Sequence, residues 1–233
     1  MVNSKAFNKI YTRKMINLDF QTDSVKKMKK FFEKAGVNDL VMIFYAGHGF
    51  LDTDLSYYFP TYYTDFSDPK INSVAYTEFE KLFSGMNSIR KLMFIDACFS
   101  GEVDTEVIPG NEEKGKAKKD SSRKAGSVLF TQSTALEMSK AVFTDLRQHS
   151  GVTVISSAGG TEAAWEAEAW KNGLFTYCML SGMKDLKADL NKNGKVTLNE
   201  LQKFVSEEVN RLSDGEQTPT YRVENTILDY ELW

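Results

Sequence analysis

The chain is poor in cysteine, has no large excess of either charge and contains no long apolar run. Cys98 and Cys178 are its only cysteines, which excludes a disulfide framework and a four-cysteine zinc site. A free thiol suits a reducing compartment, so we expect a cytoplasmic protein. The net charge of -3 gives no reason to expect a nucleic-acid partner. No run approaches the roughly 20 apolar residues of a membrane span, and the first residues are too polar for a signal peptide, so no membrane partner is expected.

The length and hydrophobic content of the chain are typical of one globular domain. With 233 residues, of which 42% are hydrophobic, the chain can bury a sizeable core. Expected strands alternate with expected helices, which predicts an α/β fold with a mostly parallel sheet and helices on both faces. The expected order is a strand at 15–20, a helix at 24–36, a strand at 40–48, a hairpin at 55–63, a helix capped by Thr77 and Glu80, a strand at 91–97, a helix at 135–148, a strand at 152–156, a helix from 175 that holds Cys178 in the core, and final elements that include a strand at 227–233.

Two segments about fifty positions apart share one pattern. Residues 40–49 and 91–101 are each an apolar run typical of a buried parallel strand, and each ends in a turn of small residues. His48 follows the first run and Cys98 follows the second. Because the carboxyl ends of neighbouring parallel strands face one crevice, we expect the imidazole and the thiol to meet there.

This pair of side chains predicts nucleophilic catalysis. A cysteine attacks as its thiolate, and a nearby imidazole takes its proton or stabilises the anion. Gly49 leaves the backbone open, so its amide and that of Cys98 are the expected donors to an oxyanion. Taken singly, a cysteine or a histidine at a strand end is more often structural, and it is their pairing on two similar strands that favours catalysis.

The same residues resemble a known family. Ala46-Gly-His48-Gly49 and Asp96-Ala-Cys98-Phe-Ser-Gly101 are similar to the motifs of the caspase-like cysteine peptidases, in particular the metacaspase and bacterial caspase-homologue branch. Three further segments share the resemblance: 57–60 (Tyr-Tyr-Phe-Pro), 173–177 (Gly-Leu-Phe-Thr-Tyr) and 217–219 (Gln-Thr-Pro). The resemblance implies a three-layer sandwich and a peptidase. Asp96 stands where animal caspases have glutamine, which argues against cleavage after aspartate.

The resemblance also implies how the chain is divided. Residues 1–233 form one caspase-like domain, with a large-subunit-like part at 14–101, a charged linker at 102–126 and a small-subunit-like part at 127–233. Such domains usually open with a strand and a helix before the segment that matches residue 15 onwards. Either the chain is a fragment of a longer protein or its sheet is built differently, and we favour the fragment.

The charged linker has two interpretations. Residues 102–126 carry six acidic and six basic side chains and little that suits a core, which is typical of a solvated loop. In caspase-like enzymes the same connection is often cut during maturation. We therefore expect the chain to cleave itself here slowly, at one of the lysines or arginines.

Asp96 is the residue from which we predict specificity. It lies two positions before Cys98 and so falls on the same side of the strand, where a carboxylate favours a basic P1 residue. The chain has no arginine between 150 and 210, and residues 161–168 are acidic, which also favours Arg or Lys at P1. The alternative is that Asp96 caps a turn. Ala46 and Glu166 are further expected substrate-binding residues, and Ser156 and Ser157 are expected to bind the substrate through their backbone groups. Trp165 is expected to line the second pocket, and the alternative is that it is a packed aromatic.

Residues 189–200 match the twelve-residue calcium loop. The ligand positions hold Asp189, Asn191, Asn193, Lys195 and Glu200, and Gly194 stands at the sharp turn. Only two of these residues are acidic, so any affinity for calcium is expected to be weak. The alternative is a stable helix connection without metal. The predicted peptidase chemistry itself requires no cofactor.

Taken together, the sequence predicts a cysteine endopeptidase that cleaves protein or peptide substrates after Arg or Lys. Two alternatives stay open at this point: a catalytically silent caspase-like scaffold or partner-binding module, and a relative that uses the dyad for another acyl transfer. Domains of this kind are commonly controlled, so an activating partner or a fused domain is expected.

Overall fold

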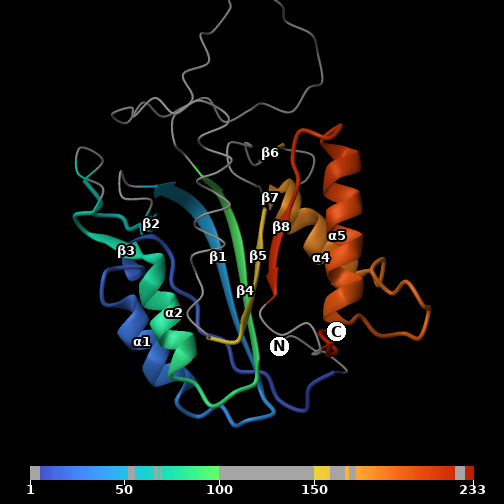
Figure 1. Cartoon of the computed structure of the whole chain (residues 1–233), viewed down its shortest axis with the longest axis horizontal. Coiled ribbons are helices and arrows are strands. Elements are labelled where there is room, and N and C mark those ends of the chain that lie inside the picture. Colours follow the sequence, from blue (N-terminus) through green and yellow to red (C-terminus); the bar gives the residue numbers. More distant parts are fainter. Residues whose placement is uncertain are drawn as a thin grey trace, which may run out of the picture.

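The computed structural model describes residues 6–51, 56–65, 68, 70–99, 150–157, 166–167, 172–223 and 229–233. Its centre is a six-stranded sheet in the order β3-β2-β1-β4-β5-β8 (Figure 1). The strands β1 (Leu40–Leu51), β4 (Arg90–Phe99) and β5 (Val152–Ser156) are mutually parallel. The outer strands β2 (Tyr57–Pro60), β3 (Ser73–Ala75) and β8 (Thr220–Val223) pair antiparallel. The predicted α/β fold with a mostly parallel centre is confirmed.

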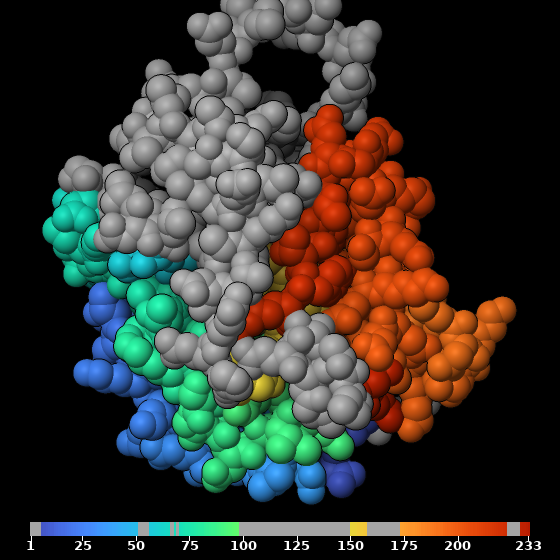
Figure 2. Space-filling model, viewed as in Figure 1, coloured from blue at the N-terminus to red at the C-terminus, as the bar shows by residue number. Residues whose placement is uncertain are grey.

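Helices cover the two faces of this sheet. The helices α1 (Ser24–Phe32) and α2 (Tyr76–Ser84) pack on one face, and α4 (Leu174–Lys184) and α5 (Leu198–Leu212) pack on the other (Figure 1). Odd-numbered residues of β1 and β4 join the core under α1 and α2, whereas Leu92 and Phe94 join the core under α4 and α5. In Figure 2 the blue-to-green and the orange-to-red parts of the chain accordingly form opposite sides of the molecule.

The two central strands are covered unequally. Residues 91–95 of β4 are buried on both faces, as predicted. On β1, Met42 and Phe44 remain 37% and 43% exposed while Val41 and Ile43 are buried. The expectation that β1 is buried on both faces is therefore wrong, because the layer of α4 and α5 covers β4 and β5. The face of β1 that holds the even-numbered positions stays open.

Three local predictions are also wrong. Residues 15–20 form a 3-10 turn, η1 (Asn17–Asp19), instead of a strand, because Asn17 adopts a φ of 48° and Asp19 N bonds back to Ile16 O. The helix α2 has no side-chain cap. Its Glu80 is buried and pairs instead with Arg222 of β8.

The third concerns the end of the chain. Residues 229–233 do not form a strand at the edge of the main sheet. They lie against the start of α5, where Leu232 N donates to Val196 O and Leu198 N donates to Tyr230 O. The side chains of Tyr230 and Leu232 are buried there. The helix expected at 135–148 and the linker at 102–126 lie outside the described residues. In the described part of the chain, every helix is too short or too polar to traverse a lipid bilayer.

Candidate active site

The two residues expected to react are direct neighbours across the sheet. In the parallel register of β1 and β4, His48 is the partner of Cys98 and Ala46 is the partner of Asp96. Neighbouring strands lie about 4.8 Å apart, so the two positions are within reach of a thiol–imidazole contact. For Cys98 the structure describes the backbone and not the side chain. The side chain of His48, which lies near the carboxyl end of β1, is partly exposed.

Tyr45 fixes the backbone at His48. Its hydroxyl donates a hydrogen bond of 2.7 Å to the carbonyl oxygen of His48. The ring is packed against Phe20 and Phe59, and burial raises the pKa of the phenol. A Cβ at Gly47 would lie 2.9 Å from the Tyr45 hydroxyl. The glycine before His48 therefore lets the tyrosine reach the carbonyl that it holds.

Gly49 is needed for packing as well as for its amide. A Cβ at this position would lie 1.6 Å from the hydroxyl oxygen of Tyr57 and 2.3 Å from the ring carbon that carries it. Tyr57 is the strand partner of Leu51, so the first side chain of β2 packs against the strand residue that follows His48. Any larger residue at 49 would displace that tyrosine and move the backbone expected to bind an oxyanion.

Asp96 lies at the amino-terminal end of α4. Its Oδ2 accepts a hydrogen bond from the hydroxyl of Thr176, in the first turn of that helix. Gly173, the residue that caps the helix, is so close that a Cβ there would lie 2.8 Å from Oδ2. A carboxylate is favoured here by the partial positive charge of the helix terminus. The position of Asp96 is therefore compatible both with capping a turn and with binding a substrate.

A small hairpin brings Glu166 to the same location. The strands β6 (Glu166–Ala167) and β7 (Asn172–Gly173) pair antiparallel, with Glu166 opposite Gly173. Because the Asp96 carboxylate lies beside Gly173, the backbone of Glu166 lies one strand away from that carboxylate. Trp165 and the side chain of Glu166 lie outside the described residues. The exposed Ala46 stands beside Asp96 on β1 and completes this group.

Ser156 and Ser157 have structural roles. Both are fully buried, and Ser157 N donates to Ile95 O over 2.8 Å. The carbonyl of Ser157 accepts a hydrogen bond of 2.7 Å from Nε2 of the buried Gln217. Ser156 pairs with Ile95 on one side and Thr220 on the other. The backbone groups of Ser157 thus hold β5 and the 217–219 segment beside β4, and in this arrangement they are not presented to a substrate.

The loop at 189–200 has the hydrogen bonds expected of a calcium loop. Asp189 accepts bonds from the backbone of Asn193 and Gly194, Asn191 and Asn193 each accept one within the loop, and Glu200 accepts one from Asn191 N. Gly194 adopts a φ of 81°, as the sharp turn requires. Within the described ranges, however, no group of three His, Cys, Asp or Glu side chains could hold a metal ion. The loop therefore has suitable shape and oxygen donors but little charge, and calcium binding stays a prediction.

Glu200 has a second role, which the sequence pattern did not separate from the first. Together with Thr197 it forms a capping box at the start of α5. Neither role excludes the other, because one carboxylate oxygen bonds Thr197 N and the other bonds Asn191 N.

Sequence reasoning missed Tyr45 and Thr176 as residues of the site. For Tyr45 a signal existed, since an apolar strand that carries a polar hydroxyl three positions before the expected base suggests a local hydrogen bond. Thr176 gave no such signal, because it is 80 residues from Asp96 in sequence and only the placement of α4 joins them.

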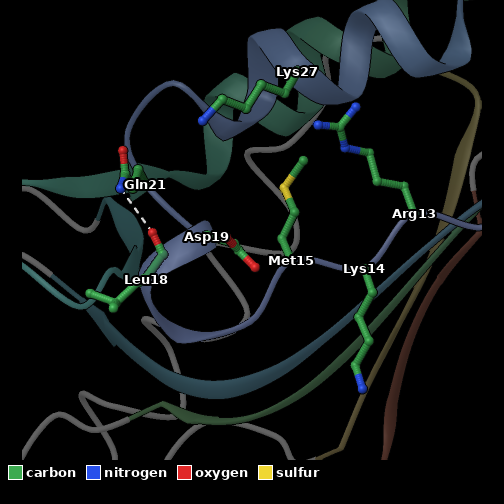
Figure 3. Close-up of a pocket in the computed structure, with 7 residues that line it drawn as sticks. All are labelled: Arg13, Lys14, Met15, Leu18, Asp19, Gln21 and Lys27. Atoms are coloured by element: carbon green, nitrogen blue, oxygen red, sulfur yellow. Dashed lines mark hydrogen bonds between the residues drawn. The ribbon is translucent and has the colours of Figure 1, made fainter.

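A hollow elsewhere on the surface is not part of this site. Its lining residues all come from positions 13–27 (Figure 3), and none comes from β1 or β4. Three cations and Asp19 surround it, and Gln21 Nε2 donates to Leu18 O at its edge. Neither a cysteine nor a histidine lines it, and it is shaped by the turn before α1.

The chain is similar to known proteins in its sequence and in its fold. The sequence matches the family model of the caspase domain, Peptidase_C14, over residues 11–229. No curated protein matches it significantly. Among solved structures, the protein GSU0716 from Geobacter sulfurreducens is similar at 18% identity and a TM-score of 0.49, covering 86% of this chain and 71% of its own.

Proposed function

The chain belongs to the caspase-domain family of cysteine peptidases, and from this premise we propose that it is an endopeptidase that cleaves after Arg or Lys with His48 and Cys98 as its dyad. The family match confirms the caspase-like resemblance, while the metacaspase branch stays a prediction. The observation that carries the proposal is the β1–β4 register, in which His48 and Cys98 are partners at the open ends of two parallel strands.

The proposed reaction has two stages. His48 takes the thiol proton as the Cys98 sulfur attacks the scissile carbonyl carbon, and the amides of Gly49 and Cys98 bind the oxyanion. When the C–N bond breaks, His48 gives its proton to the leaving amine and a thioester remains. Water then attacks the thioester with His48 as base, which releases the carboxylate product and restores the thiol. No step needs a cofactor.

Access to the proposed site is supported by the uneven covering of the sheet. The face of β1 that holds Ala46 and the partly exposed His48 is not covered by α4 and α5, and Phe44 is 43% exposed beside them. Ligands of open α/β sheets bind in the crevice outside the carboxyl ends of the strands, and this exposure leaves the end of β1 accessible there.

The preference for a basic P1 residue is supported by the Asp96 carboxylate beside Gly173. A Cβ at Gly173 would lie 2.8 Å from Asp96 Oδ2, and Glu166 is the strand partner of Gly173. The Asp96 carboxylate beside this glycine favours an ammonium or guanidinium group. It disfavours aspartate, for which like charges would meet.

A fluorogenic peptide panel tests the proposal. Peptides that differ only in Arg, Lys or Asp at P1 are compared with and without calcium, and we expect turnover of the first two. Labelling by a Lys- or Arg-directed acyloxymethyl ketone is expected to disappear in Cys98→Ala and in His48→Ala. Cys178→Ala is the matched control, because its thiol is buried in the core and should not affect labelling. Turnover of the Asp peptide alone would refute the basic specificity. Equal labelling of the wild type and Cys98→Ala would favour a silent scaffold.

A further inference from the structure

The carboxylate of Asp96 is held by an element far away in sequence. Thr176 donates its hydroxyl hydrogen to Asp96 Oδ2 from the first turn of α4. The helix that carries Thr176 is anchored by side chains buried in the core, namely Leu174, Phe175, Cys178 and Met179. The position of the hydroxyl is therefore fixed by the packing of α4, which does not involve Asp96.

Because Gly173 has no side chain, the Asp96 carboxylate can approach the backbone closely at this position. Ideal Cβ geometry at this residue places the added carbon 2.8 Å from Oδ2 and 3.2 Å from Oδ1. Both oxygens of Asp96 are thus pressed against the backbone that precedes the helix. A side chain at 173 would push the carboxylate away from Thr176, because real Cβ atoms do not approach oxygen so closely.

These contacts decide how the carboxylate is presented. A guanidinium or ammonium group binds a carboxylate best when the oxygens keep one orientation, because the cost of ordering the side chain is then already met by the fold. Asp96 has two rotatable side-chain bonds, and the hydroxyl of Thr176 fixes the outer one. A hydrogen bond to the ionised form also favours that form.

We propose that Thr176 is a specificity-determining positioning residue that orients the Asp96 carboxylate for a basic P1 side chain, with Gly173 providing the space for it. This inference rests on the proposed function, since it concerns the pocket of the same site. Thr176 itself does not act on the scissile bond. Its removal should therefore change the binding of basic substrates more than it changes the chemical step.

The test compares four variants in two assays. Thr176→Val removes the hydroxyl and keeps the shape, Thr176→Ser restores it, and Gly173→Ala displaces the carboxylate. Ser181→Ala is the matched control, because Ser181 lies on the same helix but its hydroxyl donates to Cys178 O. The first assay measures kcat and KM on an Arg-P1 peptide. The second measures the Kd of the same uncleaved peptide by calorimetry in a Cys98→Ala background.

For Thr176→Val and Gly173→Ala we expect KM and Kd to rise about tenfold, the size typical of a lost hydrogen bond to a charged group, with kcat changed less than twofold. Thr176→Ser and Ser181→Ala should match the wild type. Unchanged KM and Kd in Thr176→Val would overturn the inference, and so would a loss confined to kcat. If Thr176→Val does not fold, as judged by its melting curve, Gly173→Ala decides by the same criteria.

The design separates failure of the inference from failure of the proposed function. A wild type that binds the Arg peptide without cleaving it would refute the peptidase proposal, and the Kd values would still decide the role of Thr176. A wild type that neither binds nor cleaves it would overturn both. Cleavage of the Arg peptide with equal KM in every variant would leave the peptidase standing and remove Thr176 from its pocket.

Discussion

Tyr45 holds the backbone of His48 from within the core, and its loss tests how much the base depends on that support. In Tyr45→Phe the ring packing against Phe59 remains, but the hydrogen bond to His48 O disappears. We expect kcat/KM on a basic peptide to fall about fivefold, because one neutral hydrogen bond is worth about 1 kcal/mol. The control is Tyr62→Phe, at a tyrosine that is 66% exposed. Equal kcat/KM in both variants would contradict this role of Tyr45.

Cys178 should be chemically silent in the folded protein. Burial raises the pKa of its thiol to about 12, so the thiolate is scarce at every pH below that value. We expect iodoacetamide at pH 8 to modify one cysteine in the native wild type, none in native Cys98→Ala and both in urea. Mass spectrometry counts the adducts. An adduct on native Cys98→Ala would show that the core around Cys178 opens readily.

A buried ion pair links α2 to the edge strand β8. Glu80 Oε1 and Arg222 Nη1 are 2.5 Å apart, with side chains 2% and 9% exposed. Removing one partner leaves the other charge buried, so we expect Glu80→Ala to lower the free energy of unfolding by about 3–5 kcal/mol. Lys81→Ala, which breaks an exposed pair with Glu78, should cost less than about 1 kcal/mol.

Urea unfolding measures both variants, and the double variant Glu80→Met with Arg222→Met completes the comparison. It should be more stable than Glu80→Ala, since no unpaired charge is left in the core. A loss in Glu80→Ala no larger than that in Lys81→Ala would mean that water reaches the pair. In that case α2 and β8 would not be fixed to each other by charge.

The loop before α5 offers the test for calcium. Because Asp189 and Glu200 are the only acidic residues of the loop, we expect a Kd on the order of 10⁻⁴–10⁻³ M and a higher melting temperature in millimolar calcium. Glu200→Gln removes one charge but keeps a side chain that can form the capping box with Thr197, so it should fold normally and lose the calcium response. Calorimetry that records no heat, together with an unchanged melting temperature, would rule out the site.

At the scale of the whole molecule, the expected self-cleavage in 102–126 should nick the chain without separating it. We expect wild-type protein to convert slowly to two bands on a denaturing gel and Cys98→Ala to stay whole. The parts on either side are joined by the parallel pairing of β4 and β5 and by a shared core of Leu92, Phe94 and Ile155. Size-exclusion chromatography should therefore show the mass of the intact chain. Equal nicking of both proteins would exclude self-cleavage.

The elements whose signal is local were predictable. The strand at 152–156 and the helix beginning near 175 lie where the apolar patterns put them, because each buries its own periodic side chains. Elements that depend on distant partners were not. Glu80 has the spacing of a capping residue, yet it is buried and forms an ion pair with Arg222, 142 positions later. The residues at 229–233 look like an edge strand but bond to Val196 and Leu198 instead.

The amino-acid sequence by itself determined that two parallel strands carry His48 and Cys98 near their carboxyl ends, because apolar runs followed by small residues are local patterns. It also determined the family, through motifs that are short and contiguous. Only the tertiary structure decided that the two residues are strand partners, that one face of β1 stays open and that Asp96 is held by Thr176. Register, covering and long-range hydrogen bonds depend on how helices pack across the sheet, and that packing is set by the whole core at once rather than by any one segment.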